Sequence, residues 1–164
     1  MRLRIILMSL AVFALATMAG AQTQIAGTFQ CGKPDQQHAI EVGDSPGHVF
    51  VISQTKCSWT KPLEIAGIQS KDDVYAGFSE VSGNSSRYQS YGICTMTNGD
   101  KAYVRPRGSA TIKDGVPVSA EGKWTFVGGT GKLKGLKGKG TFKSTTQPDG
   151  GSTVEIEGDY TLPK

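Results

Sequence analysis

The sequence is poor in the residues that mark metal enzymes, helical proteins and membrane proteins. Its 164 residues include only two histidines, His38 and His48, and no spacing of histidine, cysteine and acidic residues matches a zinc signature. After residue 21 no segment is long and apolar enough to span a membrane, and no apolar pattern with a helical period predicts an amphipathic helix. We therefore predict no metal, no cofactor and no membrane span in the mature chain.

Nucleotide-binding loops are also missing, although the chain has a glycine cluster at Gly128–Lys132. In a P-loop a Ser or Thr follows the lysine and binds Mg²⁺, but here Leu133 follows Lys132. In the dinucleotide-binding pattern the third glycine comes earlier than Gly135 does, and a helix follows it. A tight turn between two strands is therefore the better interpretation of the cluster.

The N-terminus has the three parts of an export signal. Arg2 and Arg4 form a basic region, residues 5–16 are apolar, and residues 19–21 read Ala-Gly-Ala, a small-residue cleavage site. We predict a signal peptide at residues 1–21, cleavage after Ala21, and a secreted or periplasmic location. The alternative is an uncleaved N-terminal membrane anchor.

The mature chain predicted by this cleavage, residues 22–164, is one domain. Its 143 residues are enough to bury a hydrophobic core. Loss of the two signal arginines lowers the formal net charge from +4 to +2. So small a net charge favours no particular partner.

The chain has only three cysteines, Cys31, Cys57 and Cys94, and all lie in the mature part. Because exported proteins meet oxidising conditions, we expect one disulfide and one free thiol. Three pairings are open. We favour Cys31–Cys57, since each ends a predicted strand in the first third of the domain, whereas Cys94 lies inside an alternating run and is expected to be buried as a small apolar residue.

Apolar and polar residues alternate with a period of two along most of the mature chain. In residues 154–162 the apolar side chains and the acidic ones alternate, as in a strand with one face buried. Asn98-Gly99 and Asp114-Gly115 are strong hairpin turns. The predicted strands are 25–31, 37–42, 48–57, 74–81, 86–96, 101–113, 116–127, 137–145 and 154–162. Many short strands at this spacing predict an all-β sandwich or barrel.

The segment Lys137–Lys143 favours a barrel. Its lysines share one face with Thr141, and Gly138, Gly140 and Phe142 share the other. The lysines must face water, because burying an unpaired ammonium group is prohibitive. The glycine face then turns into the narrow interior of a barrel. We predict a single antiparallel β-barrel of about eight strands.

The run Phe126–Leu133, followed by Gly138-Lys139-Gly140, resembles the barrel superfamily of plant dirigent proteins and allene oxide cyclases. Small secreted bacterial proteins of unassigned function share this pattern, and Trp124 is typical of them. The resemblance implies that a strand ends at the glycine cluster, that a short turn caps one end of the barrel, and that the barrel forms a homo-oligomer. It implies no catalytic residue here, since the catalytic positions of the family lie on other strands.

One predicted strand face carries residues that suit a ligand. Tyr103, Arg105 and Arg107 share a face, and Tyr91 lies on the strand before. In a barrel this face is a candidate for a cavity lining that binds an aromatic or anionic ligand, because arginine forms paired hydrogen bonds with carboxylates. The alternative is a solvated outer face.

Two further groups of charges are predicted to be solvated. Asp72 and Asp73 lie beside Lys71 in a predicted loop. The second group is a basic stretch with few aromatic residues for stacking on bases, so we predict no nucleic-acid partner. Its members are Lys132, Lys134, Lys137, Lys139 and Lys143.

Three classes of function fit these observations. The first is non-catalytic binding of a small apolar or aromatic molecule, which we rank first because no acid–base pair stands out. The second is an isomerase or cyclase similar to allene oxide cyclase, which a desolvated carboxyl or thiol group inside the cavity would favour. The third is a structural or surface-interaction module whose barrel is filled by side chains.

Overall fold

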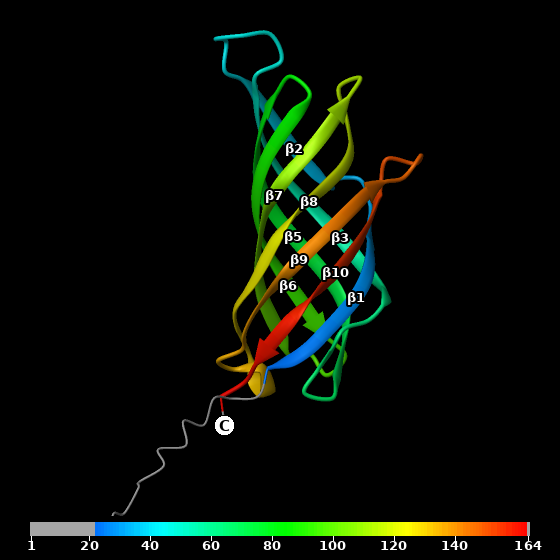
Figure 1. Ribbon diagram of the computed structural model, residues 1–164, viewed down its shortest axis with the longest axis vertical. Helices are drawn as coiled ribbons and strands as arrows, with labels where there is room; N and C mark the ends of the chain where they lie inside the picture. Colours follow the sequence, from blue (N-terminus) through cyan, green and yellow to red (C-terminus); the bar gives the residue numbers. More distant parts are fainter. Residues whose placement is uncertain (1–21, 164) are drawn as a thin grey trace, which may run out of the picture.

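Antiparallel strands make up almost all of the computed structural model, which describes residues 22–163 (Figure 1). The predicted signal peptide lies outside the described residues. The strands are β1 (Thr23–Cys31), β2 (Gln36–Glu41), β3 (Val49–Lys61), β4 (Glu64–Ile65), β5 (Ile68–Ser82), β6 (Ser85–Met96), β7 (Lys101–Lys113), β8 (Val116–Gly129), β9 (Lys137–Thr146) and β10 (Ser152–Thr161). A short 3-10 helix, η1 (Gly131–Leu133), follows β8. No helix within residues 22–163 is long and apolar enough to cross a membrane.

Eight of these strands close into a ring. Around the ring the order is β1, β10, β9, β8, β7, β6, β5 and β3, and β3 pairs back with β1. Every pairing is antiparallel. The prediction of an all-β fold with a single antiparallel barrel of about eight strands is confirmed.

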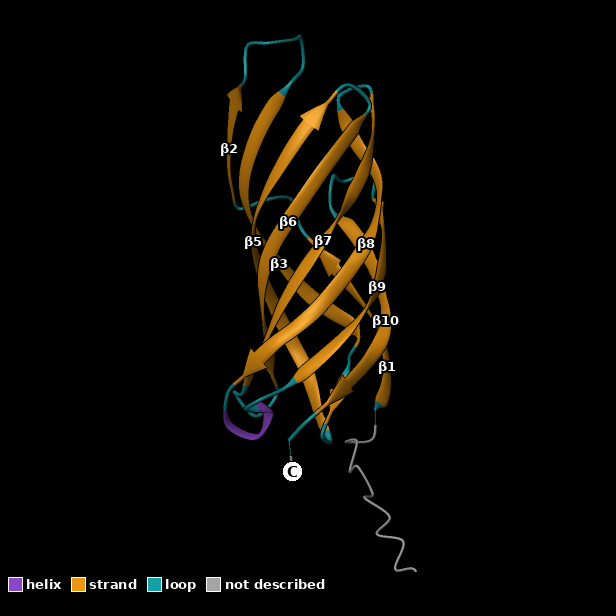
Figure 2. Cartoon of the chain, turned by 60° about the vertical axis from the view of Figure 1, so that its left-hand side comes forward, coloured by secondary structure: helices purple, strands orange, loops and turns teal. Residues whose placement is uncertain are grey.

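The pairing is shortest where β1 meets β3. Four residue pairs join these strands, whereas nine join β1 to β10. After Cys31 the chain leaves the wall, and β2 takes the place of β1 beside the rest of β3. All six residues of β2 are exposed, and its second edge pairs with no described strand. The β2–β3 hairpin therefore stands out beyond one end of the barrel (Figure 2).

The other end of the barrel is filled with apolar side chains. Here η1 lies close to the turns that follow β3 and β6 (Figure 1). The side chains packed at this end are at most 2% exposed: Leu63, Ile65, Met96, Leu133 and Leu136. A short turn thus caps this end, as the resemblance implied.

Inside the barrel, large rings lie against glycines of neighbouring strands. Trp124 on β8 packs on Gly140 and Gly158, where an added Cβ atom would come within 2.5 and 2.6 Å of the indole ring. Phe142 on β9 packs on Gly122 in the same way, at 2.8 Å. The glycine face of β9 points inward and its lysines are exposed, as the alternation predicted.

Replacing one of these glycines by alanine should destabilise the protein, because the added Cβ atom would clash with the ring packed on it. We expect Gly140→Ala to lower the free energy of unfolding by about 2–3 kcal/mol, the usual cost of overpacking an interior. Gly32→Ala is the matched control, because nothing lies within 4 Å of its Cβ position. Urea unfolding followed by tryptophan fluorescence measures both. Equal stability of the two variants would contradict the close packing.

The disulfide prediction is confirmed: Cys31 and Cys57 are bonded, and Cys94 is free and buried. The bond joins the last residue pair between β1 and β3. It therefore holds the barrel closed where its pairing is shortest.

Reduction should weaken the barrel measurably. For a sequence separation of 26 residues, loss of the crosslink is expected to cost about 3.5 kcal/mol through the entropy of the unfolded chain. Urea unfolding with and without dithiothreitol measures this loss. The Cys31→Ser, Cys57→Ser double variant is the control, and a similar effect of the reductant on it would show that the disulfide is not responsible.

Candidate functional site

The barrel is hollow between the filled end and the opposite rim. The cavity has a volume of about 480 Å³, within the usual range of small-molecule sites. All eight barrel strands line it, and it extends to Pro117, next to the β7–β8 turn, and to Gly150 in the β9–β10 turn. These turns lie at the end opposite η1 (Figure 1), so the cavity opens there.

Aromatic side chains form two groups across this cavity. The first aromatic group comes from β1, β3 and β5: Phe29, Trp59 and Tyr75. In it the ring of Phe29 lies 4.9 Å from that of Trp59 and 5.9 Å from that of Tyr75, measured between centroids. The second aromatic group comes from β6, β8 and β9: Tyr88, Trp124, Phe126 and Phe142. Such walls favour a flat, apolar ligand.

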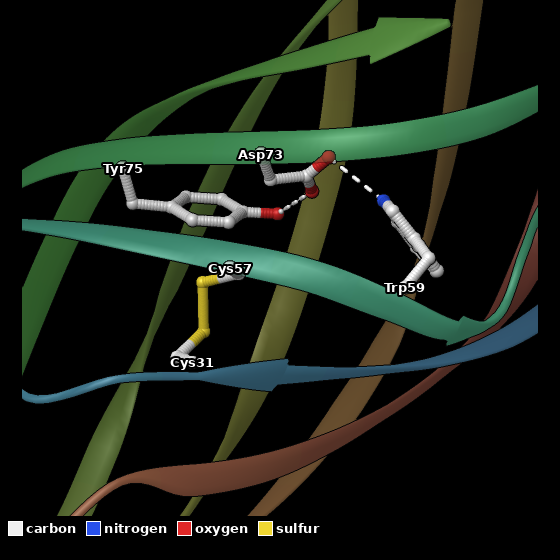
Figure 3. Close-up of a disulfide and its surroundings, with 5 residues drawn as sticks. All are labelled: Cys31, Cys57, Trp59, Asp73 and Tyr75. Atoms are coloured by element: carbon white, nitrogen blue, oxygen red, sulfur yellow. Dashed lines mark hydrogen bonds between the residues drawn. A yellow bond between two sulfur atoms is a disulfide. The ribbon is translucent and has the colours of Figure 1, made fainter. Parts of the chain in front are cut away.

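Asp73 on β5 is the acidic residue of the cavity, and its side chain is 1% exposed. Trp59 donates a hydrogen bond from its indole Nε1 to one carboxyl oxygen, at 2.8 Å. The hydroxyl group of Tyr75 donates to the other oxygen, also at 2.8 Å. Figure 3 shows both bonds, with the Cys31–Cys57 disulfide nearby. Two side chains of the first aromatic group therefore fix the orientation of the carboxyl group.

Burial controls the protonation of this part of the cavity. Loss of water raises the pKa of Asp73 above its ordinary value, and the hydrogen-bonding groups of Trp59, Cys94 and Tyr75 offset only part of that rise. Cys94 stands opposite Asp73 on β6, and burial raises the pKa of its thiol. Burial and the nearby Asp73 raise the pKa of Tyr75 as well. The thiol and the phenol are therefore protonated at neutral pH, and Asp73 is the group that can titrate.

The sequence-based prediction that Asp73 is solvated is wrong. Strand β5 begins at Ile68, six residues before the predicted start, and its register with β6 shifts between Ser70 and Asp72. Alternation back from Tyr75 places Asp73 inside the barrel. Asp72 stays at the surface as predicted, 3.7 Å from the ammonium group of Lys71. Extending the predicted strand back by one residue would have placed Asp73 on the same face as Tyr75.

The residues predicted to bind a ligand gather on the outside of the barrel. Arg105 lies 5.6 Å above the ring of Tyr91, and the rings of Tyr91 and Tyr103 are 6.1 Å apart. Both Arg105 and Arg107 are exposed, and none of the four residues lines the cavity. Of the two alternatives considered from the sequence, this face is therefore the solvated outer face and not a lining of the cavity.

The side chains of Tyr91, Tyr103 and Arg105 come together on the outer wall, and Arg107 lies on the same face of β7. On β7 the residues that point inward are Val104 and Pro106. Alternation along the strand then places Tyr103, Arg105 and Arg107 outside. Their role in binding a ligand stays a prediction.

Metal binding finds no support in the described residues. Within residues 22–163, no three or more His, Cys, Asp or Glu side chains are grouped so that they could hold a metal ion.

Comparison with known proteins identifies the fold. No protein-family model matches the chain, and no curated protein is similar to it in sequence. Among solved structures, the pterocarpan synthase dirigent protein GePTS1 superposes with a TM-score of 0.53 and 14% identity, over 96% of this chain and 98% of that protein. A conserved protein of unknown function from Rhodopseudomonas palustris superposes with a TM-score of 0.49 and 11% identity, over 85% and 98% of the two chains. The chain thus has the eight-stranded barrel fold of the dirigent proteins, and the resemblance seen in the sequence is confirmed for the fold.

The raised pKa of Asp73 predicts how stability depends on pH. Because the folded state holds the proton more tightly than the unfolded state does, stability should fall as the pH rises from about 4 through the folded pKa. Asp73→Asn removes this ionisation. We expect the variant to melt at a higher temperature than the wild type at pH 8, with a difference that shrinks toward pH 4. Asp72→Asn, at the exposed neighbour, should show no such trend, and a pH-independent effect of Asp73→Asn would contradict the argument.

Proposed function

We propose that the cavity binds a small molecule that is mainly apolar or aromatic. The observation that carries this proposal is the cavity itself, open at one end and walled by two groups of aromatic side chains. A barrel filled by its own side chains, the third class considered from the sequence, would have no such space. Binding a small apolar ligand removes both the ligand and the rings from water, which is the main driving force for such complexes.

We also propose that the protein works outside the cytoplasm, in the periplasm or after secretion. The export signal predicted at residues 1–21 supports this location, and so does the Cys31–Cys57 disulfide, a bond that persists mainly in oxidising compartments.

Catalysis by Asp73 is a second candidate, and a specific observation favours it. A desolvated carboxyl group in the cavity is the feature expected of an isomerase or cyclase, and Asp73 is such a group. A carboxyl group kept protonated by an apolar site can donate a hydrogen bond or a proton to a bound substrate. In this role Asp73 would donate its proton to a basic atom of the substrate during ring closure or isomerisation, and the resulting carboxylate would take a proton back as the product forms.

A pair of tryptophan substitutions tests cavity binding. Ala120 lines the cavity and Ala26 is exposed on β1, so Ala120→Trp should fill the ligand space while Ala26→Trp leaves it open. With the neutral dye N-phenyl-1-naphthylamine as probe, we expect Ala120→Trp to weaken binding at least tenfold and Ala26→Trp to leave it unchanged. Fluorescence titration measures both affinities, and near-ultraviolet circular dichroism checks the fold.

Equal affinity of the two tryptophan variants would place the dye elsewhere and overturn the proposal. Arg105→Ala and Arg107→Ala extend the test to the outer wall: cavity binding predicts no change, and a loss of affinity would place the ligand outside. Native mass spectrometry of the protein exported through its own signal then reveals whether a ligand is retained, as an excess mass that denaturation removes.

A further inference from the structure

The cavity has an unbalanced set of charged groups. Among its lining residues there is no Lys, Arg, His or Glu, and Asp73 provides the one carboxyl group. The other polar lining groups are mainly hydroxyl and amide groups, such as those of Ser53, Thr55 and Ser90. An anionic ligand would lose its hydration here and find no positive side chain, so the cavity should exclude anions.

Asp73 is placed to meet a positive charge. Trp59 donates a hydrogen bond to one carboxyl oxygen and Tyr75 to the other, and each oxygen of an ionised carboxylate can accept more than one hydrogen bond. Both bonds stabilise the ionised form. The groups that face Asp73 from the adjacent strands, the disulfide sulfur of Cys57 on β3 and the thiol of Cys94 on β6, supply no positive charge. The ionised carboxylate thus lacks a counter-charge within the described residues.

The rings next to Asp73 suit a cation as well. Trp59 and Tyr75 touch the carboxyl group, and the ring of Phe29 lies within 6 Å of both, measured between centroids. Aromatic faces attract cations, and the attraction is larger where water is excluded. An ammonium group in this region would therefore gain from the carboxylate and from the rings, while hydrogen bonds already hold the carboxylate in place.

We infer that the ligand is an aromatic molecule with a single positive charge, such as a protonated amine or a quaternary nitrogen. Its charged group lies against Asp73, and its ring lies between the first and second aromatic groups. This inference rests on the proposed binding function and adds the charge of the ligand.

Three probes with one ring system and different charges separate the two proposals. They are 1-naphthylmethyl-trimethylammonium (positive), 1-naphthylmethanol (neutral) and 1-naphthoate (negative), each titrated at pH 7.5 by isothermal calorimetry into the full mature protein. We expect the cation to bind at least tenfold more tightly than the alcohol, and the anion not to bind measurably. Asp73→Asn should bring the cation to the affinity of the alcohol, whereas Asp72→Asn, at the exposed neighbour, should leave the preference intact.

The outcomes are distinguishable. If the alcohol binds as tightly as the cation, or the anion binds as tightly as either, the inferred charge is wrong while cavity binding stands. If none of the probes binds, the proposed function fails and the inference with it. Should Asp73→Asn fail to fold, the affinities of the wild-type protein for the three probes still decide whether the ligand is a cation. The preference for one charge is measured on the wild-type protein alone.

Discussion

The packing of large rings on glycine backbone is the interaction on which the rest of this barrel depends. Trp124 and Phe142 can lie flat along the wall only because the strands beside them present Gly140, Gly158 and Gly122. A ring that lies along the wall takes little of the interior, so a small barrel can be lined with aromatic side chains and still keep a cavity of about 480 Å³. The same rings bury much apolar surface, which is the main source of stability in a domain of this size. The glycines thus provide stability and ligand space together.

Asp73 has the opposite effect on stability, because it is a buried carboxyl group in an interior that is otherwise mainly apolar. A carboxyl group that is 1% exposed costs free energy when it ionises, even with two hydrogen bonds from the protein. The surrounding structure holds it in a defined geometry, since Trp59 and Tyr75 both pack in the first aromatic group and point their donors at it. Buried groups of this kind concentrate at binding and catalytic sites, where a loss of stability is accepted for function. Both candidate functions use the same group, as a counter-charge in one case and as a proton donor in the other.

Much of the fold was predictable because the faces of several strands are marked by charge. On β9 the desolvation cost of lysine decides which face is outside, and this choice fixes the inward glycines. The same argument, applied to Arg105 and Arg107, favours the solvated outer face for that side of β7, the alternative that the structure shows. The site was harder to predict. Asp73 lies on the same inward face as Tyr75, but the strand was predicted to begin only at Val74. The pairing with β3 and β6 that continues β5 back toward Ile68 joins strands far apart in the sequence, and the local pattern does not reveal it.

The short pairing of β1 with β3 and the candidate site have residues in common. The pairing of β1 with β3 ends at Cys31 and Cys57, and Cys57 is directly opposite Asp73 on the next strand. Two residues along β3, on the same inward face, Trp59 pairs with Phe29 and donates its hydrogen bond to the carboxyl group. A change in how β1 meets β3 would therefore move a wall of the cavity and a donor of Asp73 at once. The disulfide fixes this junction, so it maintains the geometry of the site as well as the closure of the barrel.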